Sequence, residues 1–309
     1  DDDFFALGGD SLRATQMLSR IYDSFGIRLE LEILFGNPQL AKLASLIDQI
    51  KPDTGGALAV SRIMDPEVNR YPLSYAQQRL WFLDQLHHGS PQYNLSSAFR
   101  FKGSLNPAAL ENSFKELFKR HAILRVSFHE KDGQPFQEVH PELELKLPLI
   151  DLRDLPPTEG ESQALQRIRE MANQGFSLNE APLFRMALFQ LGDSEFILGL
   201  AAHHLIFDGW SFGILLKELA FFYGKFTETD PGETPGRQLP GLPIQYFDYA
   251  QWQRERLARN DLADQGEYWK RQLSGLESLH LPIDKRRPAI QTFNGSKIIV
   301  GIPAHLSDS

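Results

Sequence analysis

The sequence of 309 residues contains no cysteine. This absence excludes disulfide bridges, thiol nucleophiles and cysteine-ligated metal sites. It also suits a reducing compartment, because disulfides persist mainly in oxidising ones. We therefore expect a cytoplasmic location.

Long apolar runs and an excess of basic charge are missing as well. The longest apolar stretch, Phe196 to Phe207, is interrupted by two histidines and is too short to cross a bilayer as a helix. The N-terminus has no positive segment and no apolar signal core. The net charge is -8 with both signs interspersed, so no basic stripe indicates a nucleic-acid partner. We expect neither a membrane nor a nucleic acid as a partner.

The first 50 residues have the pattern of a small helical unit. Apolar residues at helical spacing predict a helix from Ser11 to Phe25 that stops at Gly26. A second helix is predicted to reach Ile50, with Asn37 as its N-cap and Pro38 in its first turn. We interpret residues 1–50 as most of a small helical bundle whose first helix is missing. Residues 51–70, with Pro, Gly-Gly and isolated charges, are a predicted linker.

Residues 71–309 mix helical and strand patterns, so the fold class of this part is α/β or α+β. Two strands, Leu183 to Leu191 and Phe196 to Phe207, are predicted around a turn at 192–195. Ser211 is predicted to cap the helix that follows. Further predictions are helices near 75–86, 107–121, 244–259 and 262–273, a surface loop at 227–243, an extended stretch at 279–288 and a strand at 297–302.

The first chemical site is Ser11, which follows Gly8, Gly9 and Asp10 at the start of a predicted helix. The glycines keep side chains away from the serine hydroxyl, so it can be reached from outside. The same residue types also occur at helix starts for backbone reasons alone, and a simple cap is the alternative reading. The first 50 residues contain no histidine, so a serine hydrolase has no local base here.

The segment from Phe4 to Leu12, Phe-Phe-Ala-Leu-Gly-Gly-Asp-Ser-Leu, resembles the signature of peptidyl and acyl carrier domains. In that family the serine carries a covalent phosphopantetheine arm that ends in a thiol. The resemblance implies that Ser11 is the attachment site and that phosphopantetheine is the cofactor. It also implies a phosphopantetheinyl transferase as a partner.

The second chemical site is the run from His203 to Gly209, which leaves an apolar strand and enters a helix. Neighbours on a strand point to opposite faces, so we expect His203 and His204 to differ, one catalytic and one structural. The ordinary pKa of a histidine, near 6.5, suits proton transfer during amide formation. A pair of histidines that only packs in a core is the alternative. Gly209 is expected to permit a tight turn, and the helix after it to direct its positive end toward the site.

Three other segments, with the His203 run, resemble motifs of nonribosomal peptide synthetase condensation domains and occur in that family's order. The family pattern His-His-x-x-x-Asp-Gly is filled completely by His203, His204, Asp208 and Gly209. The other three segments are 74–83, 120–128 and 246–252, and the stretch from Tyr268 to Asp284 is similar to the family's join between its two lobes. The resemblance implies a chloramphenicol-acetyltransferase-like lobe at 71–309, with a second lobe that begins near Ser296 and is truncated.

By this resemblance, His204 is the active-site histidine and His203 is structural. His204 acts either as a base or as a group that orients the amine, and both readings stay open. Asp208 is expected to hold the loop through an ion pair with Arg79, although a carboxylate beside a histidine can also be a charge relay. The alternative for Arg79 is an ordinary surface arginine. Adjacent histidines on a strand diverge, so we expect no metal.

The implied function is nonribosomal peptide synthesis, in which a carrier-bound acyl or peptidyl thioester is transferred to the amine of an aminoacyl group on a downstream carrier. The implied partners are an upstream adenylation domain, the downstream carrier domain and other synthetase modules. Three alternatives remain. The chain can be a non-catalytic carrier and docking fragment, an epimerase-type or ring-forming relative of the same fold, or an acyltransferase that uses free coenzyme A.

Overall fold

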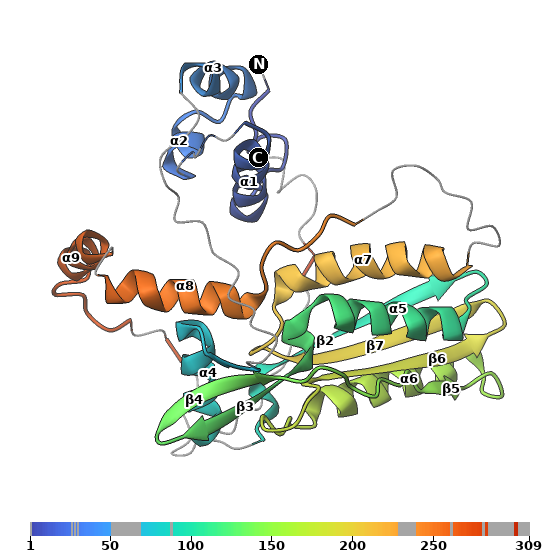
Figure 1. The fold of residues 1–309 in the computed structure, drawn as a ribbon. Helices are drawn as coiled ribbons and strands as arrows, with labels where there is room; N and C mark the ends of the chain where they lie inside the picture. Colours follow the sequence, from blue (N-terminus) through green and yellow to red (C-terminus); the bar gives the residue numbers. More distant parts are fainter. Residues whose placement is uncertain are drawn as a thin grey trace. The chain divides into compact units, whose positions relative to one another are not determined.

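The computed structural model of the protein describes residues 2–25, 27, 29, 31–50, 69–86, 89–227, 239–259, 262–279, 282–283 and 300–301. The chain divides into two compact units, Asp1–Val60 and Ser61–Ser309 (Figure 1). No helix formed by the described residues is both long enough and apolar enough to span a membrane. The two units are described separately below.

The N-terminal unit consists of three helices, α1 (Ser11–Phe25), α2 (Leu31–Gly36) and α3 (Leu40–Gln49). The predicted bounds of α1 are confirmed. Apolar residues from the helices and their connections form one small core, because each amphipathic helix buries its apolar face only against the others. The buried core residues are Ala14, Ile21, Ile27, Leu29, Leu34 and Leu43.

The start of α3 differs from the prediction, because Asn37 is not its N-cap. Gln39 occupies that position and makes no side-chain capping bond. The Nδ2 atom of Asn37 instead donates to the Ile33 carbonyl of α2 at 3.0 Å. The Pro38 carbonyl accepts from the Phe4 N–H at 2.8 Å. The loop between α2 and α3 therefore holds the segment that leads into α1.

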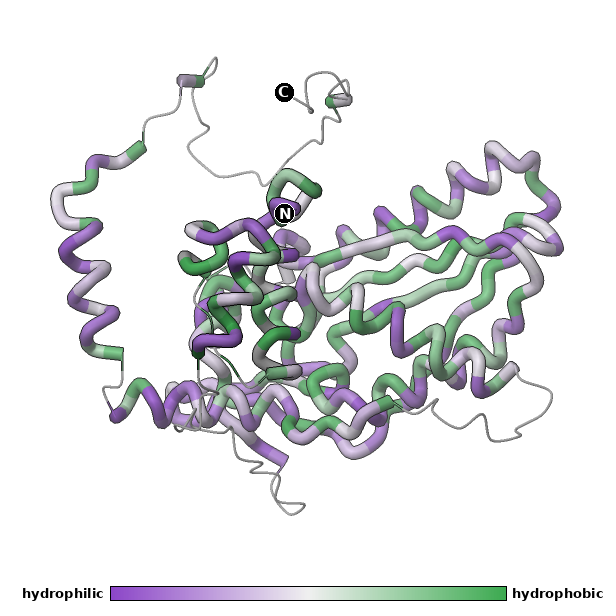
Figure 2. Tube along the Cα trace, turned by 90° about the horizontal axis from the view of Figure 1, so that it is seen from above, coloured by the Kyte–Doolittle hydropathy of each residue, from purple (hydrophilic) through white to green (hydrophobic). Residues whose placement is uncertain are grey.

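The second unit is built on a four-stranded sheet in the order β2-β7-β6-β5. Helices α5 and α7 lie on one face of this sheet and α6 on the other (Figure 1). Figure 2 shows hydrophobic residues along these strands. The strands are β2 (Asn94–Lys102), β5 (Leu149–Asp151), β6 (Phe184–Gly192) and β7 (Glu195–His203), and the helices are α5 (Pro107–Arg120), α6 (Pro157–Asn173) and α7 (Gly209–Thr227).

Side chains of β6 and β7 alternate between the two faces, as the two-residue period of a strand requires. Even-numbered residues, such as Leu188 and Leu200, join the core shared with α5 and α7. Odd-numbered residues, such as Phe189 and Ile197, pack against Ala164 and other residues of α6. The central strands β6 and β7 are therefore buried on both faces, which explains their nearly continuous apolar runs.

A smaller antiparallel sheet has the order β1-β4-β3. Arg70, expected to lie in the linker, is the first residue of β1 and pairs with Glu138 of β4. The remaining elements are β1 (Arg70–Pro72), β3 (Val126–Lys131), β4 (Gln134–Val139), α4 (Tyr75–Leu86), α8 (Tyr246–Ala258), α9 (Ala263–Gln272) and the 3-10 turns Pro91–Tyr93 and Ala122–Arg125.

Most of the predicted helices of the second unit are confirmed to within two residues. The predicted strand from Phe196 to Phe207 exists as β7 but ends earlier than predicted. β7 ends at His203, and residues 204–206 form a turn. The predicted linker at 51–68, most of the loop at 227–243 and most of the stretches at 279–288 and 297–302 lie outside the described residues. Val300 and Gly301, which are described, belong to no strand.

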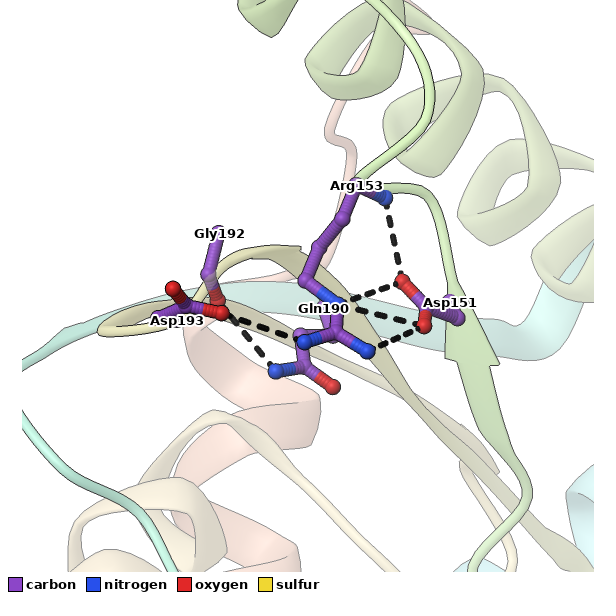
Figure 3. A network of polar contacts seen from close by, with 5 residues as sticks. All are labelled: Asp151, Arg153, Gln190, Gly192 and Asp193. Atoms are coloured by element: carbon purple, nitrogen blue, oxygen red, sulfur yellow. Dashed lines mark hydrogen bonds and ion pairs between the residues drawn. The ribbon is translucent and has the colours of Figure 1, made fainter.

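An exposed network of ion pairs lies near the N-terminal end of β7, at the other end of the strand from His203 (Figure 3). Arg153 donates to Asp151 at 2.6 Å and to Asp193 at 3.1 Å, which ties the end of β5 to the β6–β7 turn. Hydrogen bonds from Arg153 lower the pKa of Asp151 to about 2. Because β7 spans nine residues, this network lies roughly 30 Å from the histidines and plays no part in their chemistry.

The contact between α6 and the sheet gives a stability prediction. A Cβ atom at Gly199 of β7 would lie 2.4 Å from Ile168 Cγ1. We expect Gly199→Ala to lower the free energy of unfolding by about 1–3 kcal/mol, because α6 must move away from the sheet. Urea denaturation followed by circular dichroism measures this change.

Gly213→Ala is the matched control. Gly213 lies in α7, and its added Cβ would meet no atom within 4 Å. This variant should be neutral or more stable by up to about 1 kcal/mol, since alanine favours helix. Equal stabilities of the Gly199→Ala variant and the wild type would contradict the close packing of α6.

Candidate active site at the end of strand β7

His203, the last residue of β7, is buried with 1% of its surface exposed. Its Nδ1 atom accepts a hydrogen bond from the Leu205 N–H at 3.1 Å, so its proton lies on Nε2. The Nε2 atom has no hydrogen-bond partner among the described residues. The ring lies edge-on to Tyr93 and Phe176, with centroids 6.4 and 6.2 Å away. Burial, and to a lesser extent His204, lower the pKa of His203 to about 4, so this imidazole is neutral at physiological pH.

His204 is exposed and begins the turn after β7. Its backbone N–H donates to the Tyr93 carbonyl at 2.9 Å. Its Nδ1 atom lies 2.9 Å from the Phe207 carbonyl. A carbonyl can only accept, so Nδ1 carries a proton, and in the neutral imidazole Nε2 keeps a free lone pair. No described residue forms a hydrogen bond with Nε2, which leaves this atom free to meet a substrate.

The two histidines therefore differ as expected, one buried and one exposed, although the reason is not alternation along a strand. β7 ends between them, and the hydrogen bonds of the turn set the direction of His204. Tyr93, whose carbonyl holds the His204 backbone, was not found by sequence reasoning. It lies outside every recognised motif, and its contribution comes from the backbone, which leaves no signal in the side-chain pattern.

The cap of α7 differs from the prediction, which assigned it to Ser211. The Oδ1 atom of Asp208 accepts from the Ser211 N–H at 2.8 Å and from its hydroxyl at 2.6 Å. The Asp208 N–H in turn lies 3.3 Å from Ser211 Oγ. This reciprocal arrangement is that of a helix N-cap, so Asp208, and not Ser211, caps α7.

Arg79 lies exposed on α4 and forms no ion pair with Asp208. The predicted pair is absent among the described residues, and the Oδ1 atom of Asp208 instead accepts hydrogen bonds at the start of α7. Gly209 is the first residue of α7 and does not have a positive φ. A Cβ atom there would meet nothing within 4 Å, so the expected tight turn is not the reason for this glycine.

A cavity of about 750 Å³ lies between α4, β3 and the segment 175–179. Phe176, which contacts His203, lines this cavity, but His204 does not. The free Nε2 of His204 is thus on the surface of the described lobe. The described residues contain no group of three His, Cys, Asp or Glu side chains that is arranged to hold a metal ion.

In the N-terminal unit, Ser11 is the first residue of α1. Gly8 has a φ of +87°, which favours glycine, and a Cβ at Gly9 would lie 2.4 Å from the Phe4 ring. Both glycines are therefore required by the loop itself. The Asp10 carboxylate accepts from the Arg13 N–H at 2.8 Å and caps α1. This corrects the simple-cap reading of Ser11, since its neighbour performs that role.

The two sites together indicate a class of protein. A mixed α/β lobe presents one exposed histidine whose Nδ1 is bonded to a carbonyl, and a separate helical unit presents a serine at a helix start. These features fit an acyl-transfer protein that is joined to a carrier.

Two family models match the chain, the condensation domain at residues 67–309 and the phosphopantetheine attachment site at residues 1–47. The chain belongs to the condensation-domain family and carries a phosphopantetheine attachment segment before that domain.

Similar curated proteins are peptide synthetases. The chain is 40% identical over 309 residues to a component of linear gramicidin synthase from Brevibacillus parabrevis, a match that covers 99% of this chain and 4% of that protein. It is 38% identical to malpinin synthetase of Mortierella alpina, again over 99% of this chain and 4% of the relative. The chain thus spans only a small part of these relatives.

Solved structures of the family share the fold. A complex of the X-domain and OxyB from teicoplanin biosynthesis matches with a TM-score of 0.64 and 29% identity, over 76% of this chain and 50% of that one. The starter condensation domain of the rhizomide synthetase RzmA matches with a TM-score of 0.60 and 22% identity, over 68% of this chain and 49% of that one. These matches confirm the expected chloramphenicol-acetyltransferase-like α/β fold.

The capping role of Asp208 gives a second prediction. Asp208→Ala should lower the free energy of unfolding by about 1 kcal/mol, because the Ser211 N–H loses its acceptor. Asp208→Asn keeps an oxygen in the same place and should lose much less. Thermal unfolding of both variants tests this, and equal losses would show that the negative charge, and not the cap, stabilises the loop.

Proposed function

We propose that this chain takes part in nonribosomal peptide synthesis, by transferring a carrier-bound acyl or peptidyl thioester to the amine of an aminoacyl group. The observation that carries the proposal is the free Nε2 of His204, which is held outward by the Nδ1 bond to the Phe207 carbonyl. This arrangement supplies a fixed acceptor for an amine proton. His203, neutral and buried, supports the turn.

In the proposed reaction, Nε2 of His204 accepts a hydrogen bond or a proton from the attacking amine. The amine nitrogen forms the new bond to the thioester carbonyl carbon, and the carbon–sulfur bond breaks. The proton then passes to the departing sulfur, so His204 ends as it began. Asp208 and Gly209 form the start of α7. The positive N-terminal end of this helix dipole stabilises the negative charge that develops on the thioester carbonyl oxygen. Arg79 remains a proposed supporting residue, although it forms no ion pair with Asp208.

We assign the attachment of phosphopantetheine to Ser11. The position fits, because a phosphodiester at the first residue of a helix is favoured by the helix dipole and by free backbone N–H groups. The neighbouring residues Leu7, Gly8, Asp10 and Arg13 are exposed, which leaves room for a modifying enzyme. When attached, the arm supplies a thiol that carries the acyl group as a thioester.

The proposed partners follow from this chemistry. A phosphopantetheinyl transferase modifies Ser11, an upstream adenylation domain loads its thiol, and a downstream carrier domain presents the amine. We retain the boundaries 1–50, 51–70 and 71–309 as a proposal, with the structural correction at Arg70. A cytoplasmic location remains a prediction from the missing cysteine.

A docking function is the second candidate. The X-domain from teicoplanin biosynthesis, 29% identical to this chain, was solved in complex with another protein, OxyB. A domain that contains a lobe of this fold is thus found in complex with another protein. The transfer function predicts that this lobe forms an amide, in the isolated chain or in its full-length parent. The docking function predicts that it does not.

The attachment of phosphopantetheine is tested by mass spectrometry after treatment with a phosphopantetheinyl transferase and coenzyme A. The wild-type chain should gain the mass of one phosphopantetheine group. Ser11→Ala should gain none, while Ser45→Ala, which removes a serine of α3, should behave as the wild type does. An adduct that survives Ser11→Ala would refute the assignment.

The transfer is tested with His204→Ala in the full-length protein. Loss of a positioned general base typically lowers the rate 10²- to 10⁴-fold, so we expect the rate of condensed product to fall by about that factor. Gly213→Ala serves as the control on the neighbouring helix. An unchanged rate of product formation with His204→Ala would contradict the role of His204 and favour the docking function.

A further inference from the structure

Gln77 of α4 is a buried amide that links this helix to the histidine turn. Only 2% of its surface is exposed. Its Oε1 atom accepts from the Ser74 N–H at 3.0 Å, and its own N–H lies 3.2 Å from Ser74 Oγ. This pair is a capping box, in which residues at the N-cap and three positions later satisfy each other's backbone N–H groups.

The other end of the same amide reaches the candidate active site. The Nε2 atom of Gln77 donates to the Leu205 carbonyl at 3.2 Å. Leu205 directly follows His204 and is itself buried, with 3% exposed. A buried carbonyl that loses its donor is costly to leave unpaired, so this bond holds the turn in place.

The orientation of the Gln77 amide is determined by its partners. The Ser74 N–H can only donate and the Leu205 carbonyl can only accept, so oxygen and nitrogen cannot exchange places. The Nε2 atom of Gln137, fully buried on β4, also lies 3.5 Å from Gln77 Oε1. A side chain that replaces Gln77 must therefore present an acceptor on one side and a donor on the other.

The turn is also held by bonds among its own residues, including the bond from His204 to Phe207, and by Tyr93. The His204 N–H donates to Tyr93, the Leu205 N–H to His203 Nδ1 and the Ile206 N–H to the His203 carbonyl. The bond from Gln77 to Leu205 adds an anchor from α4, which belongs to a distant part of the sequence.

We infer that Gln77 is a positioning residue, which fixes the His203–Phe207 turn and so directs the Nε2 atom of His204 toward the substrate. This inference rests on the proposed function of His204. It also gives a physical role to a glutamine of the 74–83 motif.

The first test compares Gln77→Met with Gln245→Met. Gln245 is the matched control, because it also occupies the N-cap of a helix and its amide bonds a distant backbone, at Ala122 and Arg120, without touching the histidine turn. Hydrogen–deuterium exchange of the peptide containing 203–207 should become at least about tenfold faster in Gln77→Met and unchanged in Gln245→Met. The rate of product formation in the full-length protein should fall about tenfold or more in Gln77→Met alone, since small misplacements of a reacting group have effects of this size.

Gln77→Glu is the second variant and remains informative if Gln77→Met fails to fold. A protonated carboxyl can donate to Leu205 and accept from Ser74, whereas the ionised form places negative charge against the Leu205 carbonyl. The product rate of Gln77→Glu relative to the wild type should therefore be highest at low pH and decline as pH rises. A ratio that does not change with pH would contradict a role for the donor and acceptor pattern of Gln77.

The outcomes separate this inference from the proposed function. Unchanged exchange of the 203–207 peptide in Gln77→Met, or a pH-independent ratio for Gln77→Glu, would overturn the positioning role even if His204→Ala abolishes product. Faster exchange in Gln77→Met combined with full activity of His204→Ala would uphold the anchoring of the turn and refute the function of His204.

Discussion

The hydrogen bond between His204 Nδ1 and the Phe207 carbonyl determines what chemistry the end of β7 can perform. It places the proton of His204 on Nδ1 and leaves Nε2 free to accept another. The adjacent His203 has the opposite arrangement, because the Leu205 N–H occupies its Nδ1. Two identical residues, neighbours in sequence, thus become a neutral core residue and an exposed acceptor. The surrounding fold contributes by holding the backbone atoms that make this distinction.

Much of the fold was predictable where local signals are strong. Helix α1 has a regular apolar face, and α5 begins with an Asn106 side chain that caps it and Pro107 in its first turn. Helix α6 was missed because its buried positions are few, and only Ile168 among Gly160, Ala164 and Ile168 is a large apolar residue. Helix α2 has only six residues, too few for periodicity to reveal. The predicted end of β7 was too late because Leu205, Ile206 and Phe207 after it are buried, so the apolar run continues where the strand does not.

The residues of the candidate site were predictable, but the contacts among them were less so. The motif predicts different roles for His203 and His204, and the structure places one buried and the other exposed, whereas it shows no ion pair between Asp208 and Arg79. A carboxylate one helical turn from a backbone N–H forms that local bond with little loss of chain entropy, and a distant arginine must compete with it. Contacts made by the backbone, such as the Tyr93 carbonyl, do not depend on the identity of a side chain. Sequence reasoning therefore has no means to find them.

The central claim is that the turn assigns opposite tautomers to the two histidines, with the His204 proton on Nδ1 and the His203 proton on Nε2. Nitrogen-15 NMR of the histidine-labelled chain near pH 7 measures this directly, with His203→Gln and His204→Gln used to assign the signals. Our account predicts an unprotonated Nε2 in His204 and an unprotonated Nδ1 in His203. The same tautomer in both residues, or a His204 whose proton lies on Nε2, would contradict it.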